Sequence, residues 1–395
     1  MKFHKLARLG LALFFTSMGY AQKTPGPRFG NGILNIIGKD STWSMDVGLR
    51  FQFLSTFQWQ DNASMQSNFS IRRSRLKFDG FALSPKLRYK VELGLSNRDM
   101  SGTSEFTGNS PRYLLDAVVM WHPIKNVEIW AGQTKLPGNI ERVISSGNLQ
   151  QVDRSLLNRY FTIDRDIGLQ LRHEMFVGPT FLIREKLAIS QGEGRNIVTG
   201  NLGGHQFTGR LEILPFGAFK GEYLGSDLER EPHPKLMLSA TFDSNQDAVK
   251  TRSNQGDYME TDSGFYETTI NTLLADLMFK YRGFSLMGEY ALRNADDPIA
   301  KNSDGTETGD VVQEGSGSNL QAGYLFDNNW EVSMRQTHIS WDDEAVGNGD
   351  ETQYTFGISK YLVGHKLKVQ TDLSYLSVDN EEDELMYRLQ FEIHF

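Results

Sequence analysis

The chain has 395 residues, a formal net charge of -8 and no cysteine, and its isoelectric point is about 5.6. This acidic balance argues against a nucleic-acid-binding protein, and the lack of cysteine argues against disulfides and a lipid anchor on cysteine. Hydrophobic residues make up 39% of the chain and mean hydropathy is -0.43, which is too polar for a bundle of membrane helices.

Residues 1–21 have the features of a secretory signal peptide. Basic residues within the first eight positions precede a short apolar run at 9–15, and small residues stand at Gly19 and Ala21. This order is typical of a cleaved export signal, and the run is far shorter than the ~20 residues that a membrane helix needs. We expect cleavage after Ala21, with residues 22–40 forming a periplasmic N-terminal segment.

Most of the remaining chain alternates between apolar and polar residues with a period of two. In residues 71–95, Arg73 and Arg75 fall on one face of a strand while Leu76 and Phe78 fall on the other. A soluble β-sandwich also alternates, but strands of about ten residues, short bends on one side and long polar stretches on the other are typical of an outer-membrane barrel. The supply of 25 Phe, 14 Tyr and 6 Trp suits the aromatic girdles of such a barrel.

The alternating pattern gives seventeen candidate strands, and a single-chain bacterial barrel should have an even number. Counting forward from the turn at Ser84 and back from the end of the chain leaves no room for a full strand at 218–225. We therefore assign 218–225 to a long periplasmic connection and predict an all-β fold, a transmembrane antiparallel β-barrel of 16 strands over residues 41–395. The candidates lie near 44–59, 68–79, 87–96, 112–122, 126–133, 165–173, 178–189, 205–214, 218–225, 235–243, 272–281, 284–293, 317–326, 330–339, 351–361, 365–377 and 385–395.

The last candidate strand, "LMYRLQFEIHF", shows the alternation most clearly. Its polar set includes Arg388, Gln390 and Glu392, which we expect to face a watery lumen. Its apolar set should face lipid, and the terminal aromatic should anchor the strand at a membrane interface. The apolar set consists of Leu385, Tyr387, Leu389, Phe391, Ile393 and Phe395.

Residues 131–168, "AGQTKLPGNIERVISSGNLQQVDRSLLNRYFTIDRDIG", suggest a family. Together with "IRRSRLKFDG", "FTGRLEILPFG", "DLMFKY" and "GEY", they resemble, in their order along the chain, the phosphate-selective porin family (the porin O/P type) of Gram-negative outer membranes. The resemblance implies a homotrimer of sixteen-stranded channels. It also implies that the third external loop, here 134–164, folds into the barrel and narrows it.

Basic residues on the early strands and in this loop are the candidate pore-lining, anion-binding residues. An anion entering a constriction loses part of its hydration, which guanidinium and ammonium donors replace. A plainer interpretation is that lumen charges pair with each other, for example Arg73 or Lys77 with Glu141, Asp153 or Asp164. The candidates are Arg73, Arg75, Lys77, Arg88, Lys90, Lys135, Arg142, Arg154 and Arg159.

The third loop also contains several acids, Glu141, Asp153 and Asp164, with Asp166 just after it, and no dense lysine cluster. We therefore predict passive diffusion of small anions, phosphate among them, rather than strict phosphate selectivity. We expect no enzyme activity, cofactor or metal site, because no nucleophile–base motif or metal-ligand spacing is present. The alternative is a structural barrel subunit that joins other outer-membrane proteins in a larger complex. Its lumen would be plugged or non-selective, and loops 243–271 and 294–318 would dock a surface protein.

Overall fold

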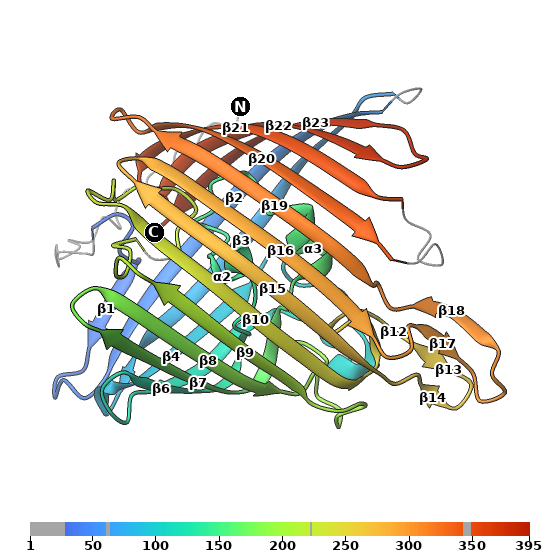
Figure 1. The fold of residues 1–395 in the computed structure, drawn as a ribbon. Coiled ribbons are helices and arrows are strands. Elements are labelled where there is room, and N and C mark those ends of the chain that lie inside the picture. Colours follow the sequence, from blue (N-terminus) through green and yellow to red (C-terminus); the bar gives the residue numbers. More distant parts are fainter. Residues whose placement is uncertain (1–27, 61–63, 222, 343–348) are drawn as a thin grey trace, which may run out of the picture.

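The computed structural model describes residues 28–60, 64–221, 223–342 and 349–395, so the expected signal peptide at 1–21 lies outside the described residues. Sixteen antiparallel strands close into a tilted barrel (Figure 1), as predicted. The strands are β2 (Ser44–Gln60), β3 (Gln66–Ala82), β4 (Ser84–Gly94), β5 (Leu114–Trp121), β6 (Val127–Lys135), β7 (Arg165–Val177), β8 (Phe181–Ser190), β9 (Gln206–Leu214), β10 (Lys235–Ala248), β15 (Thr268–Tyr281), β16 (Phe284–Ala295), β19 (Gly315–Leu325), β20 (Trp330–Trp341), β21 (Glu351–Val363), β22 (Leu367–Val378) and β23 (Glu384–His394).

The barrel closes because β2 pairs with β3 on one side and with β23 on the other, where Phe53 lies opposite Phe391. A short strand that the sequence pattern did not predict, β1 (Leu34–Ile37), pairs with the first residues of β2. The described residues between β9 and β10 contain no strand, which confirms that 218–225 is a connection.

The wall is polar inside and apolar outside, the reverse of a soluble domain. Along β20, Glu331, Ser333 and Arg335 are buried in the interior, whereas Val332 and Met334 are exposed, Met334 to 65%. Only a surrounding apolar medium makes such an arrangement favourable, because roughly 25 cal/mol is lost for each Å² of apolar surface left in water.

The connections differ between the two ends of the barrel. At one end most are tight, as between β15 and β16. At the other end several are long and fold into hairpins of their own (Figure 1). The polar stretches 243–271 and 294–318, expected to be loops, thus contain three small two-stranded sheets, and buried residues such as Met259 and Val312 pack between them. The hairpin strands are β11 (Lys250–Arg252), β12 (Gln255–Tyr258), β13 (Glu260–Thr261), β14 (Gly264–Phe265), β17 (Ile299–Lys301) and β18 (Glu307–Val311), and a 3-10 helix, η1 (Glu105–Thr107), lies between β4 and β5.

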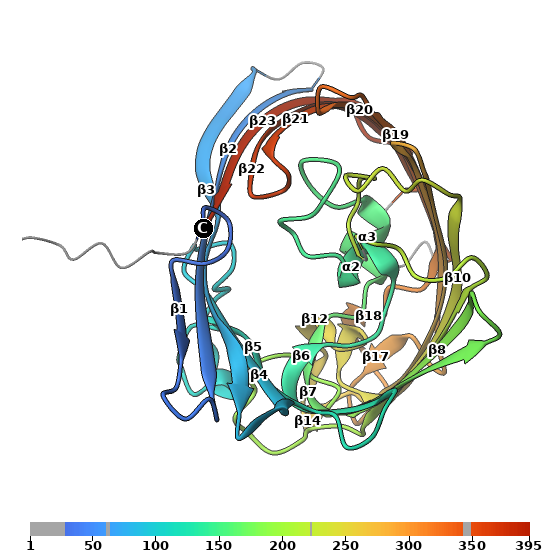
Figure 2. The same cartoon turned by 90° about the vertical axis from the view of Figure 1, so that its left-hand side faces the viewer.

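Two connections fill much of the interior. Residues 136–164, here called the inner loop, join β6 to β7 and carry α2 (Ile140–Val143) and α3 (Leu156–Phe161), which lie inside the ring of strands (Figure 2). The described residues of 215–234, here called the inner brace, join β9 to β10 at the opposite end. No helix among the described residues is long and apolar enough to cross a membrane.

The inner loop and the inner brace share an apolar core with one side of the barrel wall. Adjacent strands β8, β9, β10, β15 and β16 present apolar side chains to the interior, where Ile140 and Ile144 of the inner loop and Phe219 of the inner brace pack on them. These apolar positions interrupt the polar interior pattern and mark the area that the inserted segments cover. They are Leu182, Leu214, Met237, Met278 and Met287.

Candidate functional site

A cavity of about 200 Å³ lies between the inner loop and the wall formed by β3 to β7. Its lining contains eight arginines and one lysine but only two carboxylates. These residues come from β3, the inner loop, the ends of β6 and β7, and the connections that follow β4 and β8. The lining consists of Arg72, Arg73, Arg75, Arg98, Asp99, Leu115, Lys135, Arg142, Ser146, Arg154, Asp164, Arg165 and Arg195.

A bulge in β3 directs two consecutive arginines to the same cavity. Gln52 of β2 pairs with Arg73, but the next residue, Phe53, pairs with Ile71, so Arg72 is an extra residue in the ladder. Both guanidinium groups contact the same carboxylate of the inner loop: Asp153 lies 2.7 Å from Arg72 Nη2 and 3.2 Å from Arg73 Nη2. The bulge therefore adds a second cation to the interior, where strict alternation would have turned Arg72 outward.

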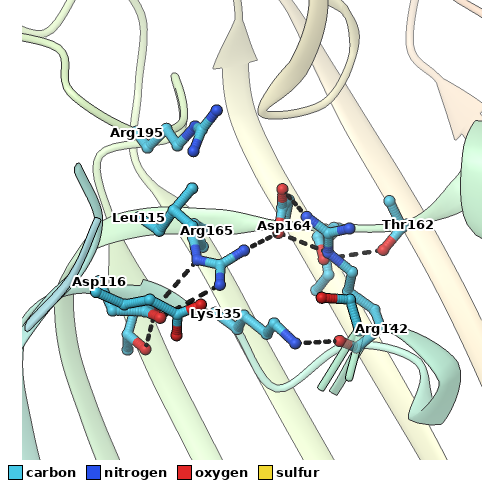
Figure 3. Close-up of polar contacts among 12 residues, drawn as sticks. Leu115, Asp116, Lys135, Arg142, Thr162, Asp164, Arg165 and Arg195 are labelled. Atoms are coloured by element: carbon cyan, nitrogen blue, oxygen red, sulfur yellow. Dashed lines mark hydrogen bonds and ion pairs between the residues drawn. The ribbon is translucent and has the colours of Figure 1, made fainter. Parts of the chain in front are cut away.

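A second group of charges fixes the two ends of the inner loop (Figure 3). At the start of β7, Arg165 donates to Asp116 of β5 from Nε at 3.0 Å, and its Nη1 lies 3.7 Å from Asp164. Arg142 donates from Nε to the same carboxylate oxygen, Asp164 Oδ1, at 2.6 Å. At the end of β6, Lys135 donates to the carbonyl of Arg142 at 2.7 Å, close to the end of α2. The basic side chains are thus held in place by a small number of shared acceptors.

Two acids of the inner loop, Asp153 and Asp164, remain ionised beside these cations. Burial raises the pKa of Asp153, but the neighbouring Arg72 and Arg73 outweigh it and hold this pKa well below its ordinary value. Burial likewise opposes the ionisation of Asp164, and its two arginine neighbours again lower its pKa.

Arg154 shows most clearly that the cavity lining carries more positive than negative charge. It donates to the carbonyls of Glu141 at 3.0 Å and Ile144 at 2.8 Å, and it forms no ion pair with any other described residue. Burial, together with repulsion from Arg142 and Arg73, lowers the pKa of Arg154 well below its ordinary value. An anion in the cavity would relieve this repulsion.

Sequence reasoning selected nine basic residues, and five of them line this cavity: Arg73, Arg75, Lys135, Arg142 and Arg154. The plainer interpretation also describes part of the arrangement, because Arg73 does pair with Asp153. The pairing does not remove the excess of cations.

The other four predicted residues lie outside the cavity lining. Lys77 pairs with Asp79 at 2.8 Å, and Lys90 pairs with Asp116 at 2.7 Å. Arg88 is exposed near the tight-turn end of β4, and Arg159 is exposed with its guanidinium 5.1 Å from the ring of Tyr160.

Four basic lining residues were not among those selected from the sequence: Arg72, Arg98, Arg165 and Arg195. The adjacent arginines at 72 and 73 were a usable signal, since a strand seldom places two charges on opposite faces when one face meets lipid. Arg98 and Arg195 lie in connections whose direction alternation cannot give.

The inner loop is held against the wall that faces this cavity. The Gln150 side chain donates to Ser285 at 2.8 Å and to Glu331 at 2.7 Å, and accepts from Gln321 at 2.8 Å. Its backbone carbonyl accepts from Gln370 at 2.8 Å. Contacts with β16, β19, β20 and β22 thus anchor this part of the loop to the wall.

The closed sixteen-stranded barrel with an inserted connection is the porin fold. An anion-selective porin from Comamonas acidovorans superposes with a TM-score of 0.57 at 12% identity, covering 89% of this chain and 100% of that chain. The channel DcaP of Acinetobacter baumannii gives 0.55 at 12% identity, covering 91% and 99%. The trimer form of OmpT of Vibrio cholerae gives 0.51 at 11% identity, covering 88% and 99%. At these identities the likeness concerns the fold.

The model of the family "Phosphate-selective porin O and P" matches residues 46–390, and the chain belongs to this family. The match spans nearly the whole barrel and confirms the resemblance drawn from residues 131–168. No curated protein matches the sequence.

Proposed function

We propose that the protein is an outer-membrane porin for the passive diffusion of small anions, phosphate among them. The observation that carries this proposal is the cavity lined by nine basic and two acidic side chains in an otherwise acidic protein. Family membership supports the same conclusion, since the family consists of channels and not of known enzymes. The named selectivity of the Comamonas acidovorans porin agrees with it.

The chemistry of the lining favours oxyanions over cations. Each guanidinium offers several donors in a plane, which match carboxylate or phosphate oxygens. Many donors of moderate strength, spread over β3, the inner loop and β7, replace the hydration of an anion without one tight binding site. The anion therefore enters readily and is released again.

The orientation follows from the two different ends of the barrel. In outer-membrane barrels the short turns are periplasmic and the long connections external, which makes the inner loop the third external connection, between β6 and β7. The inner loop then acts as the constriction, with the basic cavity as the route past it. Residues 1–21 serve as the export signal, and the trimer form of OmpT supports a homotrimer for this chain.

The test is a planar bilayer measurement on purified protein. In a potassium chloride gradient the reversal potential should show anion preference, and added phosphate should reduce the chloride current by competing for the same donors. Cation preference would refute the proposal. A protein that assembles but conducts no current would favour a structural barrel subunit. The packed core beneath the inner loop is consistent with that alternative, because it fills part of the lumen.

A further inference from the structure

A second cavity, of about 180 Å³, adjoins the basic cavity and is here called the outer cavity. The two cavities share Asp164 and Arg195, both labelled in Figure 3. The other residues that line the outer cavity come from the connections that follow β4 and β8 and from the β11–β12 hairpin, and none belongs to a barrel strand. The outer cavity therefore lies between the basic cavity and the end of the barrel that carries the long connections.

Three cations line the outer cavity, and none of them forms an ion pair with a described residue. Arg112 has no hydrogen bond to a described residue either, although its Nε is buried. Arg195 donates to the backbone carbonyl of Asp99 at 2.6 Å. Lys250, which is 3% exposed, donates to the backbone carbonyl of Glu193 at 2.6 Å. Their positive charges are therefore available to an anion.

Burial opposes the charge on two of these groups. Burial, together with repulsion from Arg112, lowers the pKa of Lys250 to about 8. Burial likewise lowers the pKa of Arg195 to about 10, which the neighbouring Asp164 only partly offsets. A bound anion would counter both effects, because an opposite charge nearby favours the charged form of a base.

The two carboxylates of the outer cavity do not neutralise these cations. Asp164 already pairs with two arginines of the basic cavity. Glu193, which is 2% exposed, accepts from the amide of Leu202 at 2.7 Å and from the hydroxyl of Tyr258 at 3.2 Å. Such a carboxylate repels a simple inorganic anion, but its remaining lone pairs can accept from a hydroxyl group of a ligand.

The outer cavity also differs from the basic cavity in its uncharged lining. Ser101, Asn254 and Gln255 supply hydroxyl and amide groups, whereas the described lining of the basic cavity contains a single uncharged polar residue, Ser146. Amide and hydroxyl groups can both donate to and accept from the hydroxyls of a ligand, which cations alone cannot do. Together the two cavities reach the lower end of the range, ~300–1,000 Å³, of pockets that bind small organic molecules.

We propose that the outer cavity binds hydroxylated organic phosphates, such as sugar phosphates, before they enter the basic cavity. The phosphate group binds Arg112, Arg195 and Lys250, and the hydroxyl groups bind Gln255 and Glu193. Because Arg195 lines both cavities, the same guanidinium can contact the phosphate in either one. The inference deepens the proposed function and rests on it for its effect on permeation, but binding at the outer cavity can be measured without any current.

Thiol protection measures this binding directly, because the chain has no cysteine of its own. Ser101→Cys places a thiol in the lining of the outer cavity, at an exposed residue. An uncharged thiol reagent should label it. Glucose 6-phosphate should slow the labelling at a concentration about threefold to tenfold lower than inorganic phosphate, since its hydroxyls add hydrogen bonds, and glucose should not slow it. Equal protection by the two phosphates, or none by either, would overturn the proposal.

Two substitutions in the Ser101→Cys barrel separate the phosphate contacts from the hydroxyl contacts. Arg112→Gln should raise the protecting concentrations of glucose 6-phosphate and inorganic phosphate alike, by about tenfold, because it removes a charged donor. Gln255→Ala should raise only that of glucose 6-phosphate, by about threefold to tenfold. Both variants should assemble, since Arg112 has no hydrogen bond to a described residue and the Gln255 side chain donates to the carbonyl of its neighbour Asn254.

The matched control is Arg88→Gln, at an exposed arginine near the tight-turn end of β4 and outside both linings, which should leave both protecting concentrations unchanged. No effect of Arg112→Gln would mean that the phosphate binds elsewhere. An equal effect of Gln255→Ala on both ligands would mean that the hydroxyls are not recognised. Either result would overturn the proposal.

Permeation gives the functional result. In a planar bilayer, glucose 6-phosphate added on the external side should reduce the chloride current at a lower concentration than inorganic phosphate, and Gln255→Ala should remove this difference. A barrel that conducts anions but shows no protection of the introduced thiol would refute the outer site and leave the proposed function intact. A parent barrel without anion conductance would refute the proposed function, while the labelling would still decide whether the outer cavity binds its ligand.

Discussion

Arg98→Gln is the sharpest test of the basic cavity, because it removes a charge and little else. Arg98 lines the cavity from the connection between β4 and β5 and is exposed. It has no hydrogen bond or ion pair with any described residue, in contrast to Arg75 and Arg165, which are part of paired networks. A change in selectivity in this variant would therefore report electrostatics and not a displaced loop.

The size of the effect follows from the size of the cavity. A volume of about 200 Å³ corresponds to a sphere with a radius of about 3.6 Å, so a lining guanidinium lies about 6 Å from the centre. At that distance two unit charges interact by about 0.7 kcal/mol in water and by about 2.8 kcal/mol at an effective dielectric constant of about 20. Because Arg98 is exposed, the lower value applies. Losing an interaction of about 0.7 kcal/mol lowers the anion concentration in the cavity about threefold and raises the cation concentration about threefold. The ratio of the two concentrations therefore changes about tenfold.

The assay is the reversal potential in a potassium chloride gradient, measured for the parent protein, Arg98→Gln and a control, Lys125→Gln. Lys125 is an exposed residue of the tight turn between β5 and β6, outside the cavity lining. The effect of Arg98→Gln should be largest at about 0.1 M salt, where the screening length is about 10 Å, and small at about 1 M, where it is about 3 Å. An equal shift in both variants, or no dependence on salt, would refute the reasoning.

Three further outcomes follow from the same contacts. Asp153→Asn removes the carboxylate shared by the two arginines of the β3 bulge, so anion preference in the bilayer should rise; a fall would mean that this acid mainly positions the loop. The pKa values of Asp99, Asp153 and Asp164 are all lowered, so these acids lose their charge only below the usual carboxylate range, and selectivity should stay constant between about pH 7 and about pH 5; a rise towards pH 5 would contradict the lowered values. Deleting Phe395 removes a ring contact with Phe29 and a backbone bond to β2, so the yield of heat-modifiable barrel in membranes should fall, whereas a normal yield would show that the contact is dispensable.

The sequence by itself determined the architecture of the wall. Alternation with a period of two is a local property, since each residue of a strand points opposite to its neighbours wherever the strand lies. Sixteen strands, the exclusion of 218–225 and the outward apolar faces therefore followed from the order of residues alone. The same rule put Arg73 and Arg75 on one face of β3, and both side chains line the cavity.

The tertiary structure decided the site. The bulge that brings Arg72 beside Arg73 is a change of register between two strands, and a register is a relation that one strand cannot encode. Arg98 and Arg195 reach the cavity from connections whose path depends on what they pack against. A loop has no fixed period. The charge of its residues could therefore suggest that they bind anions, but the sequence could not show which of them face the cavity.

The local sequence pattern also did not predict which part of the lumen the inner loop and the inner brace fill. Apolar residues such as Met237, Met278 and Met287 lie on interior positions, where a water-filled barrel would carry polar ones. These apolar residues at interior positions lie where the inner loop and the inner brace pack on the wall. Which segment covers those positions, and that it also covers Glu289 and Glu331, depends on contacts between residues more than a hundred positions apart in the chain. Such contacts are selected by the packing and hydrogen bonding of the whole barrel, because a buried carboxylate requires a donor from whichever segment can reach it.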